Sequence, residues 1–120
     1  MQLSLVNEDG LAFVEGQPNQ AFLLRADDVN RLIETCLAEA TYAALLYDAN
    51  LPPAFFDLSS GEAGIILQKL RNYQIRLAAV YDPARVTLSS RFKEMSDEET
   101  RGSHFGLFTA RQAAIEWLQQ

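Results

Sequence analysis

Two runs with strand character, residues 42–47 and 74–81, restrict this chain to a small group of folds. The first run, Tyr-Ala-Ala-Leu-Leu-Tyr, is apolar throughout, which is typical of a central strand covered on both faces. The segments before, between and after the runs have the periodicity of amphipathic helices. Strands that alternate with helices predict right-handed crossovers and a mainly parallel sheet.

Turn signals and residue spacing predict the remaining elements. Two short strands, residues 3–6 and 11–15, flank Asp9-Gly10, and this dipeptide between such runs predicts a hairpin. A helix follows Asp27 and Asp28, with one face predicted to be buried at i, i+3, i+4 and i+7 spacing. That face contains Val29, Leu32, Ile33, Cys36, Leu37 and Ala40.

The second half of the chain continues the alternation. Pro52 and Pro53 predict a short helical turn, which Phe55 and Phe56 anchor to the core. A helix over residues 89–101, a strand over 105–108 and a last helix complete the chain. Thr109 and Gln112 have the spacing of a capping box for that last helix.

These elements give the order β-β-α-β-α-β-α-β-α. With 120 residues, the chain is long enough for one hydrophobic core, so we expect a single α/β domain. The sheet is predicted to have five strands, mainly parallel, with one antiparallel edge strand. The order of the strands within the sheet is left open.

The segment from Asp57 into the following helix is the main candidate site. Ser59 and Glu62 have S-x-x-E spacing, which predicts a capping box. Gly61 and Gly64 fall in the first two helical turns, where each glycine costs about 1 kcal/mol relative to alanine. We therefore expect a strand, a partner or an anion to approach this backbone closely.

Other polar residues follow the predicted strands. Asp48 and Asn50 come after the strand at 42–47, Asp82 after the strand at 74–81, and Thr109 after the last strand. The carboxyl ends of parallel strands form the usual binding crevice of an open α/β sheet, so we expect these residues to lie beside the serine-glycine segment. Carboxylates at Asp48, Asp57 and Asp82 also allow a magnesium site as an alternative.

Several classes of function are disfavoured. A net charge of −6 argues against nucleic-acid binding, and no apolar run is long enough for a membrane span. Residues 1–4 lack a secretory signal, so we expect a cytoplasmic protein. Cys36 is predicted to be a buried, inert thiol, and His104 lies at the far end of its strand from Thr109. We predict no catalytic residue, no cofactor and no resident metal.

The order of elements resembles that of STAS domains, the module of sulfate transporters and anti-sigma factor antagonists. Residues 56–67, Phe-Asp-Leu-Ser-Ser-Gly-Glu-Ala-Gly-Ile-Ile-Leu, are similar to that family's Asp-Ser-Ser-Gly motif, with Leu58 inserted. In phosphorylated members the serine directly before the glycine is modified. The resemblance therefore implies Ser60 as a phosphoacceptor.

A second set of residues resembles a family of small bacterial proteins called domain of unknown function 4180. This resemblance implies no activity. The residues that carry it are Asn50-Leu51, residues 55–58, Gly61, Ala63-Gly64, residues 66–69, Asn72-Tyr73, Leu77-Ala78 and Val80.

Two functions agree with these features. The first is a non-enzymatic regulatory or interaction module, which docks a partner protein around Asp57, Ser59, Ser60, Gly61 and Gly64 and is switched by phosphorylation of Ser60. A phosphate there adds about two negative charges to the docking surface. The alternative is a binder of a small anionic ligand, or a weak magnesium-dependent enzyme, at Asp48, Asp82 and the helix N-terminus. A homodimer is compatible with both.

Overall fold

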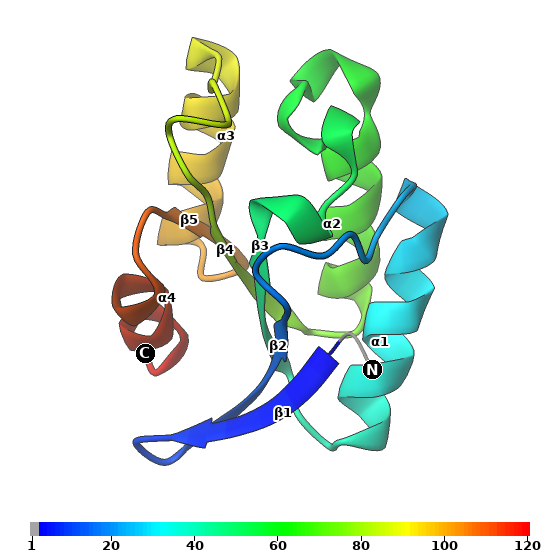
Figure 1. The fold of residues 1–120 in the computed structure, drawn as a ribbon, viewed down its shortest axis with the longest axis vertical. Coiled ribbons are helices and arrows are strands. Elements are labelled where there is room, and N and C mark those ends of the chain that lie inside the picture. Colours follow the sequence, from blue (N-terminus) through cyan, green and yellow to red (C-terminus); the bar gives the residue numbers. More distant parts are fainter. Residues whose placement is uncertain (1–2) are drawn as a thin grey trace.

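The computed structural model describes residues 3–120 and confirms the predicted order of elements (Figure 1). The absence of a secretory signal was predicted partly from Met1 and Gln2, which lie outside the described residues. The helices and strands are β1 (Leu3–Glu8), β2 (Leu11–Gly16), α1 (Val29–Ala38), β3 (Ala43–Tyr47), α2 (Glu62–Asn72), β4 (Arg76–Val80), α3 (Ser90–Arg101), β5 (Phe105–Phe108) and α4 (Arg111–Leu118).

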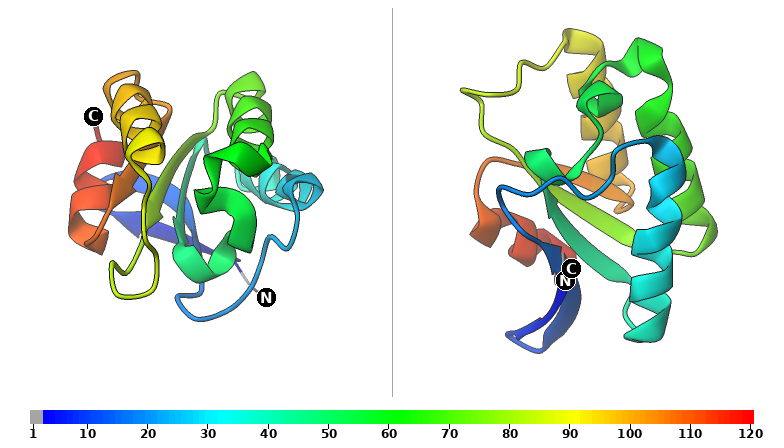
Figure 2. Two further views of the ribbon diagram at one scale, coloured as in Figure 1. Left: turned by 90° about the horizontal axis from the view of Figure 1, so that it is seen from above. Right: turned by 45° about the vertical axis from the view of Figure 1, so that its right-hand side comes forward.

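The strands form one sheet in the order β1-β2-β3-β4-β5. β1 is antiparallel to β2, and the remaining neighbours are parallel, as predicted. Each parallel crossover moves to the next strand in the same direction, so right-handed crossovers place α1, α2 and α3 on one face. Only α4 lies on the other face (Figure 2).

The predicted hairpin between β1 and β2 is present. Asp9 has φ 52° and Gly10 has φ 84°, the two positive values of a type I′ turn. The turn matches the twist of the flanking strands, so β1 and β2 pair over their full length from Leu3 opposite Gly16 to Glu8 opposite Leu11.

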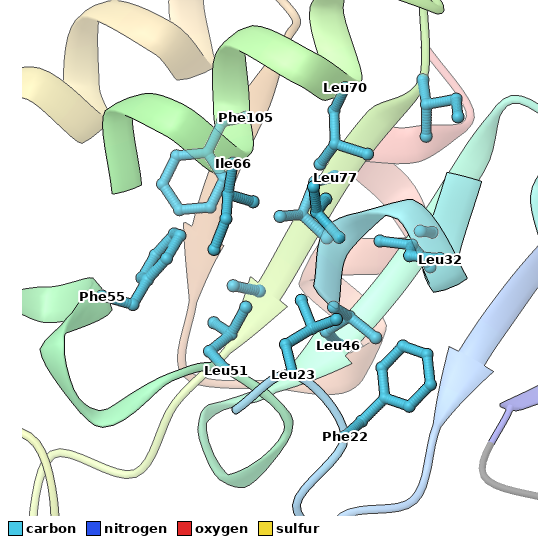
Figure 3. Close-up of a cluster of buried hydrophobic side chains, with 14 of the residues drawn as sticks. Phe22, Leu23, Leu32, Leu46, Leu51, Phe55, Ile66, Leu70, Leu77 and Phe105 are labelled. Carbon is cyan, nitrogen blue, oxygen red and sulfur yellow. The ribbon is translucent and has the colours of Figure 1, made fainter. Parts of the chain in front are cut away.

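Two hydrophobic clusters fill the space on either side of the sheet. Ala44 and Leu46 of β3 pack in the larger cluster beneath α1, α2 and α3, whereas Ala43 and Leu45 pack beneath α4. The prediction of a central strand covered on both faces is therefore confirmed. Figure 3 shows the larger cluster, which includes Phe55, as predicted.

One part of the prediction for α1 is wrong. Cys36 is buried as expected, but Leu37 is 49% exposed and Ala40 lies beyond the helix. Ala40 falls outside the helix because of a Schellman ending, in which Ala40 adopts φ 54°, its N–H donates to the Leu37 carbonyl, and the Thr41 N–H donates to the Cys36 carbonyl.

The same ending terminates two further helices. Gln74 after α2 has φ 59° and Ser103 after α3 has φ 65°. The N–H groups of Ile75 and His104 donate to carbonyls of the last helical turns, at Leu70 and Glu99. Each motif turns the chain directly from a helix into the next strand, which explains why β4 begins at Arg76 instead of the predicted residue 74.

No helix among residues 3–120 has the length and apolar character needed to cross a membrane.

Candidate functional site

The serine-glycine corner, residues 57–61, lies at the start of α2, and all its residues except the half-buried Leu58 are exposed to solvent, as predicted. Two short 3-10 turns, Pro53–Phe56 and Leu58–Ser60, lead into it. The first turn is held in place because Phe55 is buried against Phe92 and Phe105, with ring centroids 5.9 and 5.8 Å away.

The hydrogen bonds of the corner differ from those of a capping box. The Asp57 carboxylate accepts from both the N–H and the hydroxyl of Ser59, at 3.1 and 2.6 Å. The Ser60 hydroxyl donates to the Ala54 carbonyl at 2.7 Å and accepts from the Glu62 N–H at 3.1 Å. Ser60, not Ser59, therefore satisfies a free N–H of the first helical turn.

The other half of the predicted capping box is also absent. Glu62 Oε2 accepts a hydrogen bond from the backbone N–H of Ala26 at 2.9 Å. Ala26 begins the short 3-10 turn Ala26–Asp28 that leads into α1, so Glu62 connects the starts of two helices. The capping-box prediction for Ser59 and Glu62 is therefore wrong, because a more distant N–H takes the carboxylate.

The two glycines of this segment have different roles. Gly61 has φ 80°, a conformation that favours glycine, and this explains its presence. Gly64 is helical, and a Cβ built on it meets no atom within 4 Å. Neither glycine is approached closely by another described part of the chain, so the expected close approach by a strand is wrong among residues 3–120, and approach by a partner or an anion stays a prediction.

Gly64 instead opens a groove between α2 and α3. Gly64, Leu67, Gln68 and Arg71 form a stripe at helical spacing on α2. Across the groove lie Met95 and Glu99 of α3, and Leu58 closes the side nearest the corner.

The groove has an apolar floor and a charged end. Leu58, Leu67 and Met95 are partly buried against the larger core cluster. At the end, Arg71 Nη2 lies 2.7 Å from Glu99 Oε1 in an ion pair that joins the two helices. The groove has a volume of about 210 Å³, below the roughly 300–1,000 Å³ of typical small-molecule pockets.

Three of the predicted rim residues share a second, shallow pocket. Asp48, Asp82 and Thr109 line it together with Tyr47 and Arg85, as expected from the carboxyl ends of parallel strands. Within this pocket both oxygens of Asp48 are occupied. Oδ1 accepts from Arg85 Nη2 at 2.6 Å, and Oδ2 accepts from the Asp82 N–H at 2.9 Å.

Asn50 does not belong to this pocket. It is fully buried, its Oδ1 accepts from the Tyr47 N–H at 2.7 Å, and its Nδ2 donates to the carbonyls of Gln17 and Gln20. Asn50 therefore holds the loop after β2 against the end of β3. Its prediction as a rim residue is wrong, because the loop folds over it.

The corner and the rim residues form separate sites. Asp57 and Ser59 line a depression with Ser89 and Arg91 at the start of α3, whereas Asp48 and Asp82 line the shallow pocket at the ends of the strands. Among residues 3–120, no three His, Cys, Asp or Glu side chains are close enough to hold a metal ion. The magnesium hypothesis for Asp48, Asp57 and Asp82 is therefore wrong.

Sequence reasoning missed one polar cluster, on the α4 face of the sheet. Arg111 pairs with Glu8 at 2.8 Å and with Glu15 at 2.8 Å, and the Tyr47 hydroxyl donates to Glu15. Burial raises the pKa of Glu15, but hydrogen bonds from Arg111 and Tyr47 outweigh it and lower the pKa overall. Burial, together with the Glu15 carboxylate, raises the pKa of Tyr47 to about 12.

The predicted capping box misplaces the start of α4, so the sequence does not assign Arg111 to this cluster. The N-cap of α4 is Ala110, without a side-chain cap, and Gln112 Nε2 donates to Glu116. The capping box predicted for Thr109 and Gln112 is therefore wrong. The alternation of β2 does indicate this cluster. Glu15 lies two residues after the buried Phe13 and so on the same face of the strand, where its carboxylate needs a cation.

Cys36 and His104, the two residues considered for nucleophilic chemistry, lie in different parts of the fold. Cys36 is buried in the larger cluster, and burial raises the pKa of its thiol to about 12. His104 is exposed just before β5, at the opposite end of that strand from Thr109, as predicted.

The comparisons with known proteins identify a family. The sequence model of one family, described as domain of unknown function (DUF4180), matches residues 8–118. No curated protein and no solved structure matches the chain. The likeness to STAS domains and the bacterial origin therefore stay predictions. Because the match covers nearly the whole sequence, the chain belongs to the DUF4180 family.

Proposed function

We propose that this protein is a non-enzymatic interaction module whose docking surface is the groove between α2 and α3. The observation that carries this proposal is Gly64. Gly64 is the third residue of α2, and glycine within a helix costs up to about 1 kcal/mol relative to alanine, yet no backbone strain and no close neighbour requires one here. A large side chain at this position would enter the groove, which glycine leaves open.

The occupant that fits is an amphipathic helix of a partner protein. The groove lies between two helices, and its floor of Leu58, Leu67 and Met95 offers apolar contact. A helix that inserts apolar side chains at i, i+3 and i+4 is a common solution for such grooves. Arg71 and Glu99 at the end would meet the polar edge of that helix.

Phosphorylation of Ser60 would weaken this docking. Ser60 is exposed and adjoins Leu58 through the turn Leu58–Ser60. A phosphoserine has no hydroxyl proton for the Ala54 carbonyl, so one of the hydrogen bonds that hold the turn would be lost. Covering about two new negative charges with an apolar helix face also carries a desolvation cost.

The pocket at Asp48 and Asp82 is a weaker basis for a function. Its single arginine, Arg85, is paired with Asp48, and two carboxylates line the same pocket. An anionic ligand would therefore meet repulsion without a free cation among the lining residues. This geometry favours the interaction module over the anion-binding alternative.

A site-specific photocrosslinker at Gln68, introduced in the native cells, tests the docking surface. The captured protein is identified by mass spectrometry, and a synthetic peptide of its crosslinked segment is titrated against the purified chain. We expect Gly64→Arg to weaken binding at least about tenfold, and Gly64→Ala to bind normally because its Cβ has room.

Two matched variants control for charge and phosphorylation. Ala113→Arg makes the same kind of change at an exposed position of α4, and we expect it to bind like the wild type. Ser60→Asp should weaken binding more than Ser60→Ala, which loses the same hydrogen bond to the Ala54 carbonyl without adding a charge. Equal affinities for Gly64→Arg and Ala113→Arg would rule out the groove as the docking surface.

A further inference from the structure

β1 is an outer strand of the sheet, and no strand among residues 3–120 pairs with its free side (Figure 1). Its sequence contains no proline, glycine, lysine or arginine, which are residues that natural edge strands use to prevent pairing. Leu5, near its middle, is 45% exposed. The opposite edge differs, because β5 is shorter and is contacted by both α3 and α4.

The hairpin determines which backbone groups of β1 are directed outward. Glu8 and Leu11 flank its two-residue turn, and such a flanking pair is hydrogen-bonded. Hydrogen-bonded pairs alternate with non-bonded pairs in an antiparallel ladder. Val6 and Ser4 are therefore the other residues of β1 whose N–H and C=O groups are directed at β2.

A contact on the far side of β2 agrees with this alternation. The Ala12 carbonyl accepts a hydrogen bond from the Thr41 hydroxyl at 2.7 Å, so it is directed away from β1. Ala12 lies opposite Asn7, which makes that pair a non-bonded one. Leu3, Leu5 and Asn7 consequently direct their N–H and C=O groups toward the free edge.

We propose that a second copy of this chain pairs with β1 in antiparallel orientation, with Leu5 opposite Leu5 of the second copy. A two-fold axis through this pair sets Leu3 opposite Asn7 on both sides, so all three outward residues form hydrogen-bonded pairs. Such a ladder has about six main-chain hydrogen bonds. If the two-fold axis passed through Ser4 or Val6 instead, only two of the three outward residues would pair with outward residues of the second copy, so the ladder would have fewer hydrogen bonds.

An identical copy fits this edge because the edge is self-complementary. In the Leu5-centred register no two like charges face each other. Glu8, the one charged residue of β1, is already paired with Arg111 of its own chain. The five strands of each copy would form one continuous sheet, and α1, α2 and α3 of both copies would lie on the same face.

Sedimentation of the full chain with a charge exchange at Leu5 tests this pairing. We expect the wild type to associate into a species of twice its 13.4 kDa mass as concentration rises. Leu5→Lys and Leu5→Glu should each weaken association at least about tenfold, because like charges would face each other. An equimolar mixture of the two variants should restore the dimer.

A control variant away from β1 tests the surface, and amide exchange identifies the register. Leu24→Lys adds the same charge at an exposed leucine outside β1 and should leave association within about threefold of the wild type. The amide of Leu5 should exchange more slowly as the dimer forms, while the amide of Val6, already paired with β2, should not change. A monomeric wild type, unimpaired single variants, or a mixture that stays monomeric would each overturn the proposal.

Discussion

The carboxylate of Glu62 accepts a hydrogen bond from the backbone N–H of Ala26, 36 residues earlier in the chain, at 2.9 Å. Helix N-termini leave free N–H groups that need acceptors. Glu62, in the first turn of α2, therefore supplies the acceptor that the first N–H of the segment leading into α1 needs. This contact joins the first turn of α2 to the 3-10 turn that leads into α1.

The Glu62 contact predicts unequal costs for two substitutions in the same motif. Glu62→Ala leaves the Ala26 N–H without its charged acceptor and should lower the free energy of unfolding by about 1–2 kcal/mol. Ser59→Ala removes only an exposed bond to Asp57 and should cost less than about 0.5 kcal/mol. Urea unfolding of both variants measures the difference; a larger cost for Ser59→Ala would support the capping box instead.

Glycine-to-alanine substitutions should have opposite effects at two positions. A Cβ on Gly16 would lie 2.3 Å from Asn50 Oδ1, so Gly16→Ala displaces a fully buried amide and should cost about 2 kcal/mol or more. A Cβ on Gly64 meets nothing, so Gly64→Ala should stabilise the fold by up to about 1 kcal/mol. Thermal unfolding of the two variants side by side tests this, and a destabilised Gly64→Ala would contradict the open groove.

Ala40 should become a stabilising position when replaced by glycine. It holds φ 54° in the Schellman ending of α1, where a side chain costs about 1–2 kcal/mol. Ala40→Gly should therefore raise the free energy of unfolding by about 1 kcal/mol in chemical denaturation. Ala38→Gly, at the last residue of the same helix, is the control and should lower it instead, because glycine is a poorer helix former than alanine.

Glu15 should contribute stability that is lost in acid. Its folded pKa lies below its ordinary value of 4.5, so the contribution is complete above that pH and disappears as pH falls through the folded pKa. Glu15→Gln should cost about 1–2 kcal/mol at neutral pH and should flatten the acid dependence of unfolding. Glu8→Gln, at a more exposed carboxylate, should cost less than about 0.5 kcal/mol.

Cys36 should make the fold sensitive to alkali. The folded thiol has its pKa raised to about 12 from an ordinary 9.0, so above pH 9 the unfolded chain ionises first and stability falls as pH rises toward 12. The free energy of unfolding should therefore decline more steeply for the wild type than for Cys36→Ala over that range. Parallel pH profiles for the two proteins would show that the thiol ionises as easily when folded.

Local patterns in the sequence were sufficient where the deciding contacts are also local. The Asp9-Gly10 turn needs only two residues with positive φ, and both are present. The helix predicted over residues 89–101 is present as α3, and its N-cap Ser89 accepts from the Phe92 N–H three residues later. The apolar run of β3 predicts burial on both faces because its own side chains determine it.

Tertiary structure alone decided the partners of the polar residues. Glu62 bonds to Ala26 instead of Ser59, Asn50 reaches back to Gln17, and Arg111 reaches Glu8, 103 residues away in the sequence. Spacing rules describe neighbours within about four residues, whereas a side chain binds whichever group the fold places within about 3 Å. Gly64, Asp48 and Asn50 could thus be named from the sequence, but their division into a groove, a rim pocket and a buried anchor required the packed sheet and helices.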